Sequence, residues 1–352
     1  MGIMKGSEIE MKARWMKRGV IACLLAAVIA GCSQTNSPGE TQGSGQEKPE
    51  SEPLTDVKVV LDYTPNTNHT GLYVAKDLGY YEEEGLNVQI VQTGAGDPDA
   101  MVATGEVEFG VSYQENVTHA RTQGVPLVSI AAIIQHNTSG FASAAEKNIT
   151  RPKDFENKTY VGFGGPSEKA IIESLMKADG ADINKLKIVN GADIDFFTAI
   201  HKDVDLVWIY YGWTGVEAEL RGEKLNIVYL NEYSESLDFY TPVLVTNEKM
   251  IKEKPELVRA FMKATAKGYQ YAIEHPDEAA GILVKMEPDL DSELVTASQR
   301  WLSPRYQDDP PYWGMQKESV WKNYADWMME YGLLDKMPDI EAAFTNDFLP
   351  QE

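Results

Sequence analysis

The chain has 352 residues and a formal net charge of −22. This acidity argues against nucleic acid and against an anionic membrane surface as partners, because like charges repel. Only two cysteines occur, and Cys23 lies inside the apolar leader described below, so we expect neither a disulfide nor a cysteine metal cluster.

Residues 1–31 are expected to be an export signal. Four basic residues between positions 12 and 18 precede an apolar stretch, 19–30, that ends in Ile-Ala-Gly-Cys at Cys32. A basic head, a short apolar core and small residues before a cleavage site are typical of such signals, and the stretch is too short for a membrane span. The ending resembles a bacterial lipoprotein box, which implies that Cys32 is a lipid anchor. The alternative is an ordinary secretory signal with a chance cysteine.

Residues 32–54 are expected to form the lipidated cysteine and a flexible linker. Positions 33–53 carry no aliphatic or aromatic side chain and are rich in Ser, Gly, Gln, Glu and Pro. This composition is typical of a solvated linker. The roughly 300 residues that follow are enough for two lobes.

Beyond the linker, short apolar runs alternate with amphipathic stretches, which predicts an α/β fold with mixed sheets covered on both faces. The expected strands are 57–61, 88–91, 107–111, 128–134, 159–163, 187–189, 206–209, 226–229 and 242–246. The expected helices between them are 72–85, 97–104, 115–123, 168–177, 195–200 and 213–220. After position 246 the pattern is almost wholly helical, with helices expected at 255–273, 276–285, 292–302 and 318–331.

The polar run after the first strand carries the clearest functional signal. Asp62, Tyr63, Asn66 and His69 crowd the carboxyl end of a buried strand, where a helix begins. Loops at the carboxyl ends of strands in open α/β sheets commonly bind ligands, and helix N-termini there offer free N–H groups. The alternative is that these side chains only form turns and cap the helix.

A glycine-rich turn after the strand at 159–163 is a second candidate. Gly164 and its neighbours expose N–H groups that suit an anion or a carbonyl oxygen, although the Gly-Lys-Ser/Thr of a P-loop is absent. A plain tight turn explains the pattern equally well.

Three segments carry a resemblance to a known family. They are VVLDYTPNTNHTGLYVAKDLGYYEEEGLNVQIV, GEVEFGVSYQENVTHARTQGVPLVSIAAI and TNEKMIKEKPELVRAFMKATAKGYQYAIEHPDEA. Together they resemble the solute-binding proteins of ABC importers in the thiamin-pyrimidine group, in a wider family that includes eukaryotic thiamin pyrimidine synthases. The run DYTPNTNHTG resembles, more narrowly, Gram-positive lipoproteins that bind formylaminopyrimidine.

The resemblance implies a two-lobed, periplasmic-binding-protein-like (type II) fold with mixed sheets, in which two crossing strands join the lobes and the ligand lies in the cleft. Lobe one would comprise 55–145 plus 241–350, and lobe two 146–240. It also implies a monomer that binds N-formyl-4-amino-5-aminomethyl-2-methylpyrimidine for thiamin salvage and delivers it to an ABC permease and its ATPase. The chain would be extracytoplasmic and lipid-anchored to the cell membrane of a Gram-positive bacterium. Relatives on this scaffold carry sulfonates, nitrate or riboflavin.

A small neutral or weakly cationic pyrimidine calls for aromatic surfaces and hydrogen-bond acceptors. We expect stacking and an acceptor from Tyr210, Trp213 and Glu217, although an aromatic core stripe with a surface glutamate is the alternative. Further contacts are expected from Tyr113, Gln114 and Asn116 at the turn after the third strand.

An enzyme is the less favoured interpretation, and no cofactor or metal is expected. The synthases of the family use a histidine early in the helix after the third strand, where this chain has Asn116, with His119 one turn later. Their cysteine-rich stretch is also missing, since the matching region reads DFYTPVLVT. The five histidines form no H-x-x-x-H pair, and no G-x-S-x-G turn is present.

Overall fold

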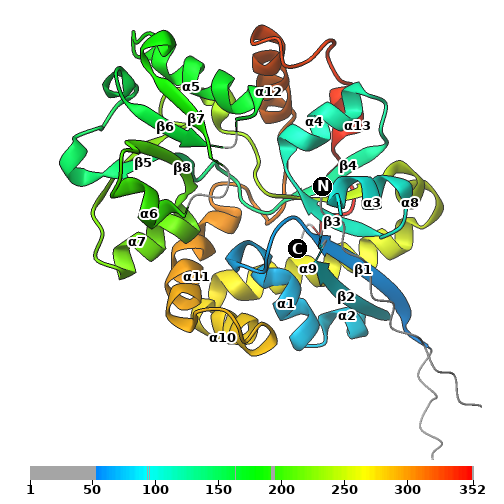
Figure 1. Ribbon diagram of the computed structural model, residues 1–352. Coiled ribbons are helices and arrows are strands. Elements are labelled where there is room, and N and C mark those ends of the chain that lie inside the picture. Colours follow the sequence, from blue (N-terminus) through cyan, green and yellow to red (C-terminus); the bar gives the residue numbers. More distant parts are fainter. Residues whose placement is uncertain (1–52, 93, 95, 163, 192–194, 351–352) are drawn as a thin grey trace, which may run out of the picture. The chain divides into compact units, whose positions relative to one another are not determined.

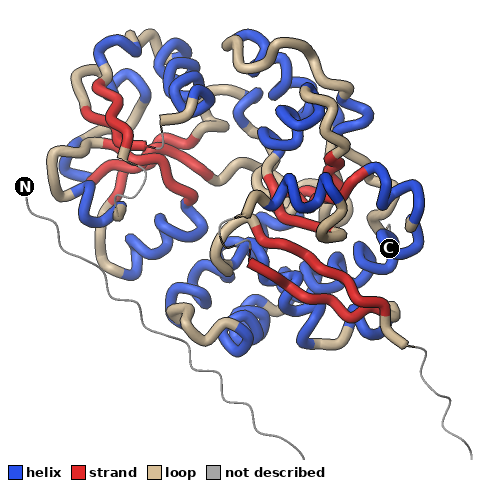
Figure 2. Tube along the Cα trace, turned by 45° about the vertical axis from the view of Figure 1, so that its right-hand side comes forward, coloured by secondary structure: helices blue, strands red, loops and turns tan. Residues whose placement is uncertain are grey.

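The computed structural model describes residues 53–92, 94, 96–162, 164–191 and 195–350. The expected export signal, the expected anchor Cys32 and nearly all of the expected linker lie outside these residues. Within them, no helix is long and apolar enough to cross a membrane. Figure 2 shows two separate groups of strands, each with helices around it.

The first sheet has five strands in the order β2-β1-β3-β10-β4. Strands β1, β2 and β3 are parallel, whereas β10 runs antiparallel to both β3 and β4. The strands are β1 (Thr55–Leu61), β2 (Leu86–Gln92), β3 (Phe109–Ser112), β4 (Leu127–Ala132) and β10 (Val243–Asn247). Alternate residues of β1 enter two different cores, Val59 on one face and Val60 on the other, so helices bury the sheet on both faces.

The helices that accompany this sheet come from both ends of the described chain. They are α1 (Thr70–Asp77), α2 (Tyr80–Glu83), α3 (Pro98–Thr104), α4 (Gln114–Thr122), α8 (Glu248–Glu253), α9 (Pro255–Glu274), α10 (Pro276–Met286), α11 (Ser292–Gln307) and α13 (Ile340–Ala343). The single helix expected at 72–85 is broken into α1 and α2, because Gly79 between them adopts φ +76°. Helices α1 and α9 pack very closely, since a Cβ at Gly268 would lie 2.1 Å from the Gly71 carbonyl oxygen.

The second sheet also has five strands, in the order β7-β6-β8-β5-β9. Strand β6 is parallel to β7 and β8, and β5 is antiparallel to β8 and β9. The strands are β5 (Ser139–Ala144), β6 (Thr159–Gly162), β7 (Lys187–Asn190), β8 (Leu206–Tyr210) and β9 (Leu225–Tyr229), and the helices are α5 (Pro166–Ala178), α6 (Phe196–Ile200), α7 (Val216–Leu220) and α12 (Glu318–Glu330). In Figure 1, α5 lies on one side of these strands and α6 and α7 on the other. The expected class, α/β with mixed sheets, is confirmed.

Short turns of other helical types complete the described chain. They are 3₁₀ turns at Thr67–His69, Ala145–Lys147, Pro152–Phe155, Ile183–Lys185 and Glu235–Leu237, and a π turn at Tyr211–Gly215.

The chain passes between the two sheets in more places than the resemblance implied. Segment 133–138 joins β4 to β5, and segment 230–242 joins β9 to β10. Segment 308–317 crosses as well, because Tyr324 and Trp327 of α12 lie in the core of the second sheet. The expected lobe boundaries remain a prediction, but β5 already belongs to the second sheet before residue 145, and α12 packs on that sheet although it follows residue 241.

Candidate ligand-binding cleft

Asp62 stands at the carboxyl end of β1 and is held from two sides. His69 Nε2 lies 2.7 Å from Asp62 Oδ1, and the Tyr113 hydroxyl donates to Oδ2 at 2.6 Å. Burial would raise the pKa of the Asp62 carboxyl, but the hydrogen bonds with His69 and Tyr113 outweigh it and lower that pKa. Asp62 is therefore an ionised acceptor.

His69 supports this carboxylate from behind. Its ring has 0% of its surface exposed, and its Nδ1 accepts the backbone N–H of Asn66 at 3.2 Å. The Asn66 side chain in turn accepts the Asn68 N–H at 2.9 Å, so that Asn66 and His69 form a reciprocal cap on the turn Thr67–His69. The sequence predicts both as ligand contacts. The structure gives both of them the capping role, and the burial of His69 keeps it from facing the cleft.

Two tyrosines from different sheets lie near Asp62. Tyr113 precedes α4, and Tyr210 ends β8. The Tyr210 side chain is 43% exposed. Burial of its hydroxyl, together with the charges of Glu115 and Asp62, raises the pKa of that hydroxyl to about 12. A hydrogen bond with Thr241 acts in the opposite direction.

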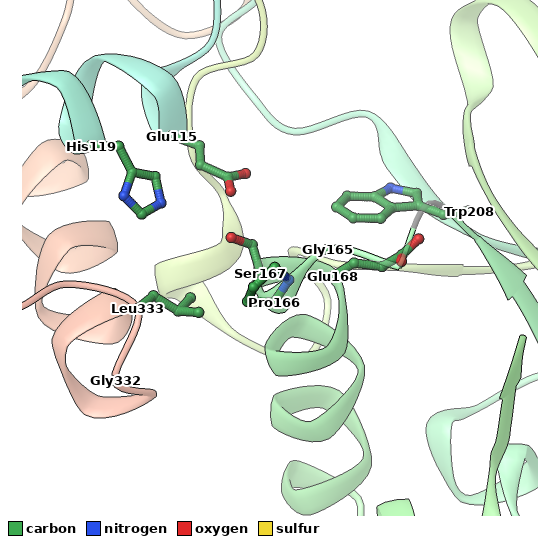
Figure 3. A pocket seen from close by; sticks show the side chains of 9 residues that line it. All are labelled: Glu115, His119, Gly165, Pro166, Ser167, Glu168, Trp208, Gly332 and Leu333. Carbon is green, nitrogen blue, oxygen red and sulfur yellow. The ribbon is translucent and has the colours of Figure 1, made fainter. Parts of the chain in front are cut away.

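A hollow of about 580 Å³ is lined by residues of α4, of β8 and of the start of α5, and one of them, Glu115, acts through its charge on the Tyr210 hydroxyl. Figure 3 shows Glu115 and His119 of α4 on one side, the start of α5 with Ser167 below, and Trp208 of β8 beyond it. Gly332 and Leu333, which follow α12, close another side. The lining residues that the structure describes include two glutamates, Glu115 and Glu168, but no lysine or arginine. The hollow is therefore acidic and partly aromatic.

The glycine turn does not present its N–H groups freely. The Gly164 N–H donates to Glu168 Oε2 at 2.6 Å, and the buried Glu168 also accepts the Tyr160 hydroxyl. Gly164 adopts φ +82° and packs against Asn190, so only glycine fits there. Of the two interpretations offered by the sequence, the structure supports a tight turn that a buried carboxylate closes.

Three further residues that the sequence predicts as ligand contacts do not line the hollow, and two of them already form hydrogen bonds within the protein. Gln114 is fully buried, since its Nε2 donates to the Val320 carbonyl and its Oε1 accepts the Tyr240 N–H. Asn116 is exposed and donates to Asp99 at 2.8 Å. Tyr63 is 69% exposed.

The last two expected residues, Trp213 in the π turn and Glu217 in α7, do not line the hollow. Trp213 packs against the core of the first sheet, in agreement with the alternative of an aromatic core. Glu217 forms an ion pair with Arg221 one turn later.

None of the residues expected from the sequence lines the hollow, but several of its walls are their chain neighbours. Glu115 follows Gln114, and Gly165 follows Gly164. Trp208 was recognisable as a member of the aromatic cluster on β8, two residues before Tyr210, where strand alternation places both on one face. The hollow is therefore lined by chain neighbours of the expected residues, and the expected ligand contacts stay a prediction.

The fold is that of the periplasmic solute-binding proteins. A solved structure of the aliphatic sulphonate-binding protein of Escherichia coli superposes with a TM-score of 0.65 over 82% of this chain and 96% of that one, at 14% identity. Residues 66–279 match the family model described as NMT1/THI5 like, and the chain belongs to this family.

Two relatives align with this chain over nearly their whole lengths. The chain is 29% identical to the formylaminopyrimidine-binding protein of Halalkalibacterium halodurans, over 93% of this chain and 98% of the relative. It is 27% identical to the 4-amino-5-hydroxymethyl-2-methylpyrimidine phosphate synthase of Legionella pneumophila, over 84% of this chain and 92% of the relative. The family thus contains both binding proteins and enzymes.

Proposed function

We propose that this chain is the extracytoplasmic solute-binding component of an ABC importer and that its ligand is formylaminopyrimidine. The observation that carries the proposal is the acidic and aromatic character of this region. Asp62 is held ionised near Tyr210, and Glu115, whose charge also acts on the Tyr210 hydroxyl, lines the hollow. The relative from H. halodurans supports the choice of ligand.

The chemistry of the ligand fits these groups. An aminopyrimidine presents N–H donors at its edge and a flat aromatic face. Asp62 and Glu115 offer carboxylate acceptors, and Tyr210 and Trp208 offer aromatic surface from the second sheet. An anion such as a sulfonate would face the Glu115 carboxylate, and the described residues that line the hollow include no lysine or arginine.

The transport step follows from the placement of these groups on two sheets. Asp62 and Glu115 belong to elements of the first sheet, and Tyr210 and Trp208 lie on β8 of the second. A ligand that contacts both sets is bound best when the lobes are closed, so its binding shifts the population toward the closed form. The closed form would dock as a monomer on a permease driven by its ATPase, while lipid on Cys32 keeps the chain at the membrane of a Gram-positive cell.

Calorimetric titration of residues 53–352 tests the proposal. The ligands are formylaminopyrimidine, the amine without the formyl group, thiamin and taurine. We expect a dissociation constant below about 1 µM for the formylated compound and at least about tenfold weaker binding of the free amine, or roughly 1.4 kcal/mol. Binding of taurine alone, or of none of the four, would contradict the pyrimidine assignment.

A pyrimidine-forming enzyme is the second candidate, because the L. pneumophila relative is a synthase. The position expected to carry the family's histidine has Asn116, which donates to Asp99. Among the residues that the structure describes, no group of three or more His, Cys, Asp and Glu is placed to hold a metal ion. Incubation with iron, followed by mass analysis for the loss of a histidine side chain, separates the two functions.

A further inference from the structure

We propose that His69 is a positioning residue, whose ring is fixed with its proton on Nε2 and holds the Asp62 carboxylate as an acceptor for an N–H donor of the ligand. The inference rests on the binding function proposed above and deepens it. It assigns ligand selection to a buried residue that cannot touch the ligand.

The backbone fixes which ring nitrogen carries the proton. The Asn66 N–H points at His69 Nδ1 at 3.2 Å, and a backbone amide only donates. Nδ1 must therefore be the acceptor, so the neutral ring carries its proton on Nε2. That nitrogen lies 2.7 Å from Asp62 Oδ1 and donates to it. The cap on the turn Thr67–His69 thus determines the hydrogen bond to the carboxylate.

The carboxylate keeps capacity for a ligand. Oδ1 accepts from His69 and Oδ2 from Tyr113, and each carboxylate oxygen accepts about two hydrogen bonds. Two bonds from opposite sides prevent rotation of the group, while 5% of the side chain remains exposed. A held carboxylate accepts but does not donate, so the site favours ligands with an amino group over those that present only carbonyl or sulfonate oxygens.

The described groups that interact with Asp62 include no lysine or arginine. The titratable groups that interact with it are His69, Tyr113, Asp99, Tyr210 and Tyr269. Burial opposes ionisation of Asp62, and the donors His69 and Tyr113 overcome it. Removing the His69 donor should therefore raise the pKa of Asp62, and binding of the ligand should then weaken as the pH falls.

Two substitutions separate the two bonds of the ring. His69→Gln places an amide N–H where Nε2 lies and so keeps the donor to Asp62. His69→Asn places an amide oxygen where Nδ1 lies and so keeps the acceptor for the Asn66 N–H but loses the donor to Asp62. Both are prepared in the full chain, and circular dichroism and thermal unfolding verify the fold of each.

Affinity for formylaminopyrimidine is measured calorimetrically from pH 4.5 to 8. We expect His69→Gln to stay within about threefold of the wild type, and His69→Asn to bind about tenfold more weakly or worse, because a hydrogen bond to a charged group is lost. We also expect the affinity of His69→Asn, and not that of His69→Gln, to decline toward low pH. Asp62→Asn serves as the reference for loss of the carboxylate and should be weaker than either.

The outcomes separate the two levels of the argument. If the wild type binds no aminopyrimidine, the proposed function is wrong. If the wild type binds and His69→Asn matches it at all pH values, the positioning role is wrong. If both variants weaken equally with no change in pH profile, or unfold together, the ring is only a cap and the positioning role is again wrong.

Discussion

His136 is expected to stabilise the crossing segments in a pH-dependent way. Its Nδ1 lies 2.6 Å from Asp238 Oδ2 and its Nε2 lies 3.3 Å from Asp309 Oδ1, and Lys317 Nζ contacts Asp309 at 2.9 Å. These residues come from three of the segments that pass between the two sheets, 133–138, 230–242 and 308–317. The cluster therefore ties these three segments together.

The magnitude follows from the pKa of His136. The hydrogen bond that the ring donates to Asp238, followed by the charges of Asp238 and Asp309, outweighs burial and raises that pKa from 6.5 to about 9. Such a rise corresponds to at most about 3 kcal/mol. Because 41% of the side chain is exposed, solvent screening reduces our expectation to about 1 kcal/mol. The folded pKa is the higher one, so this stabilisation is complete below pH 6.5 and is lost as the pH rises through 9.

Urea unfolding of His136→Gln and of the wild type at pH 6 and pH 9.5 measures the stabilisation that His136 contributes. The variant should be less stable by about 1 kcal/mol at pH 6 and nearly equal at pH 9.5. His201→Gln is the matched control. His201 Nε2 lies 3.1 Å from Glu223 Oε1 in an exposed pair, and neither residue belongs to the crossing segments. A loss that stays constant or grows toward high pH would refute the reasoning.

Three further predictions concern packing and the cleft. Gly268→Ala should destabilise the fold by about 1–3 kcal/mol in urea unfolding, because its Cβ would meet the Gly71 carbonyl oxygen. Gly281→Ala is the control, since a Cβ there has open space in α10, and it should be neutral or slightly stabilising. Equal effects of the two substitutions would contradict the close packing of α1 and α9. Glu115→Gln should weaken binding of formylaminopyrimidine about tenfold with an unchanged melting temperature, and unchanged affinity by calorimetry would remove Glu115 from the site. Dialysis against EDTA should leave that affinity unchanged, and a loss restored by a metal would contradict a metal-free binding site.

Strong local patterns made most of the fold predictable from the sequence. Strand β1 reads as a run of β-branched residues, and α9 repeats buried residues at helical spacing, so both were expected within one or two residues of their ends. Strand β5, Ser-Gly-Phe-Ala-Ser-Ala, was missed although all its residues are buried. Small residues carry little β propensity, and its place between β8 and β9 is set by pairing partners far away in the chain.

The side chains of the site were less predictable than its segments. Gln114 and Glu115 are adjacent on α4, yet one is buried against Tyr240 and the other faces the hollow. Successive helical residues point about 100° apart, and the rotation of α4 is set by tertiary packing. Asp62 was found because it ends a clear strand. The role of His69 depends on the Asn66 N–H, which no sequence pattern displays.

A diffraction structure of the chain crystallised with formylaminopyrimidine tests the central claim most directly. The account predicts the pyrimidine ring beside Tyr210, with its amino group within hydrogen-bond distance of the Asp62 carboxylate and Glu115 within reach of the ligand. A ligand bound elsewhere, or a cleft that stays empty at millimolar ligand, would contradict it.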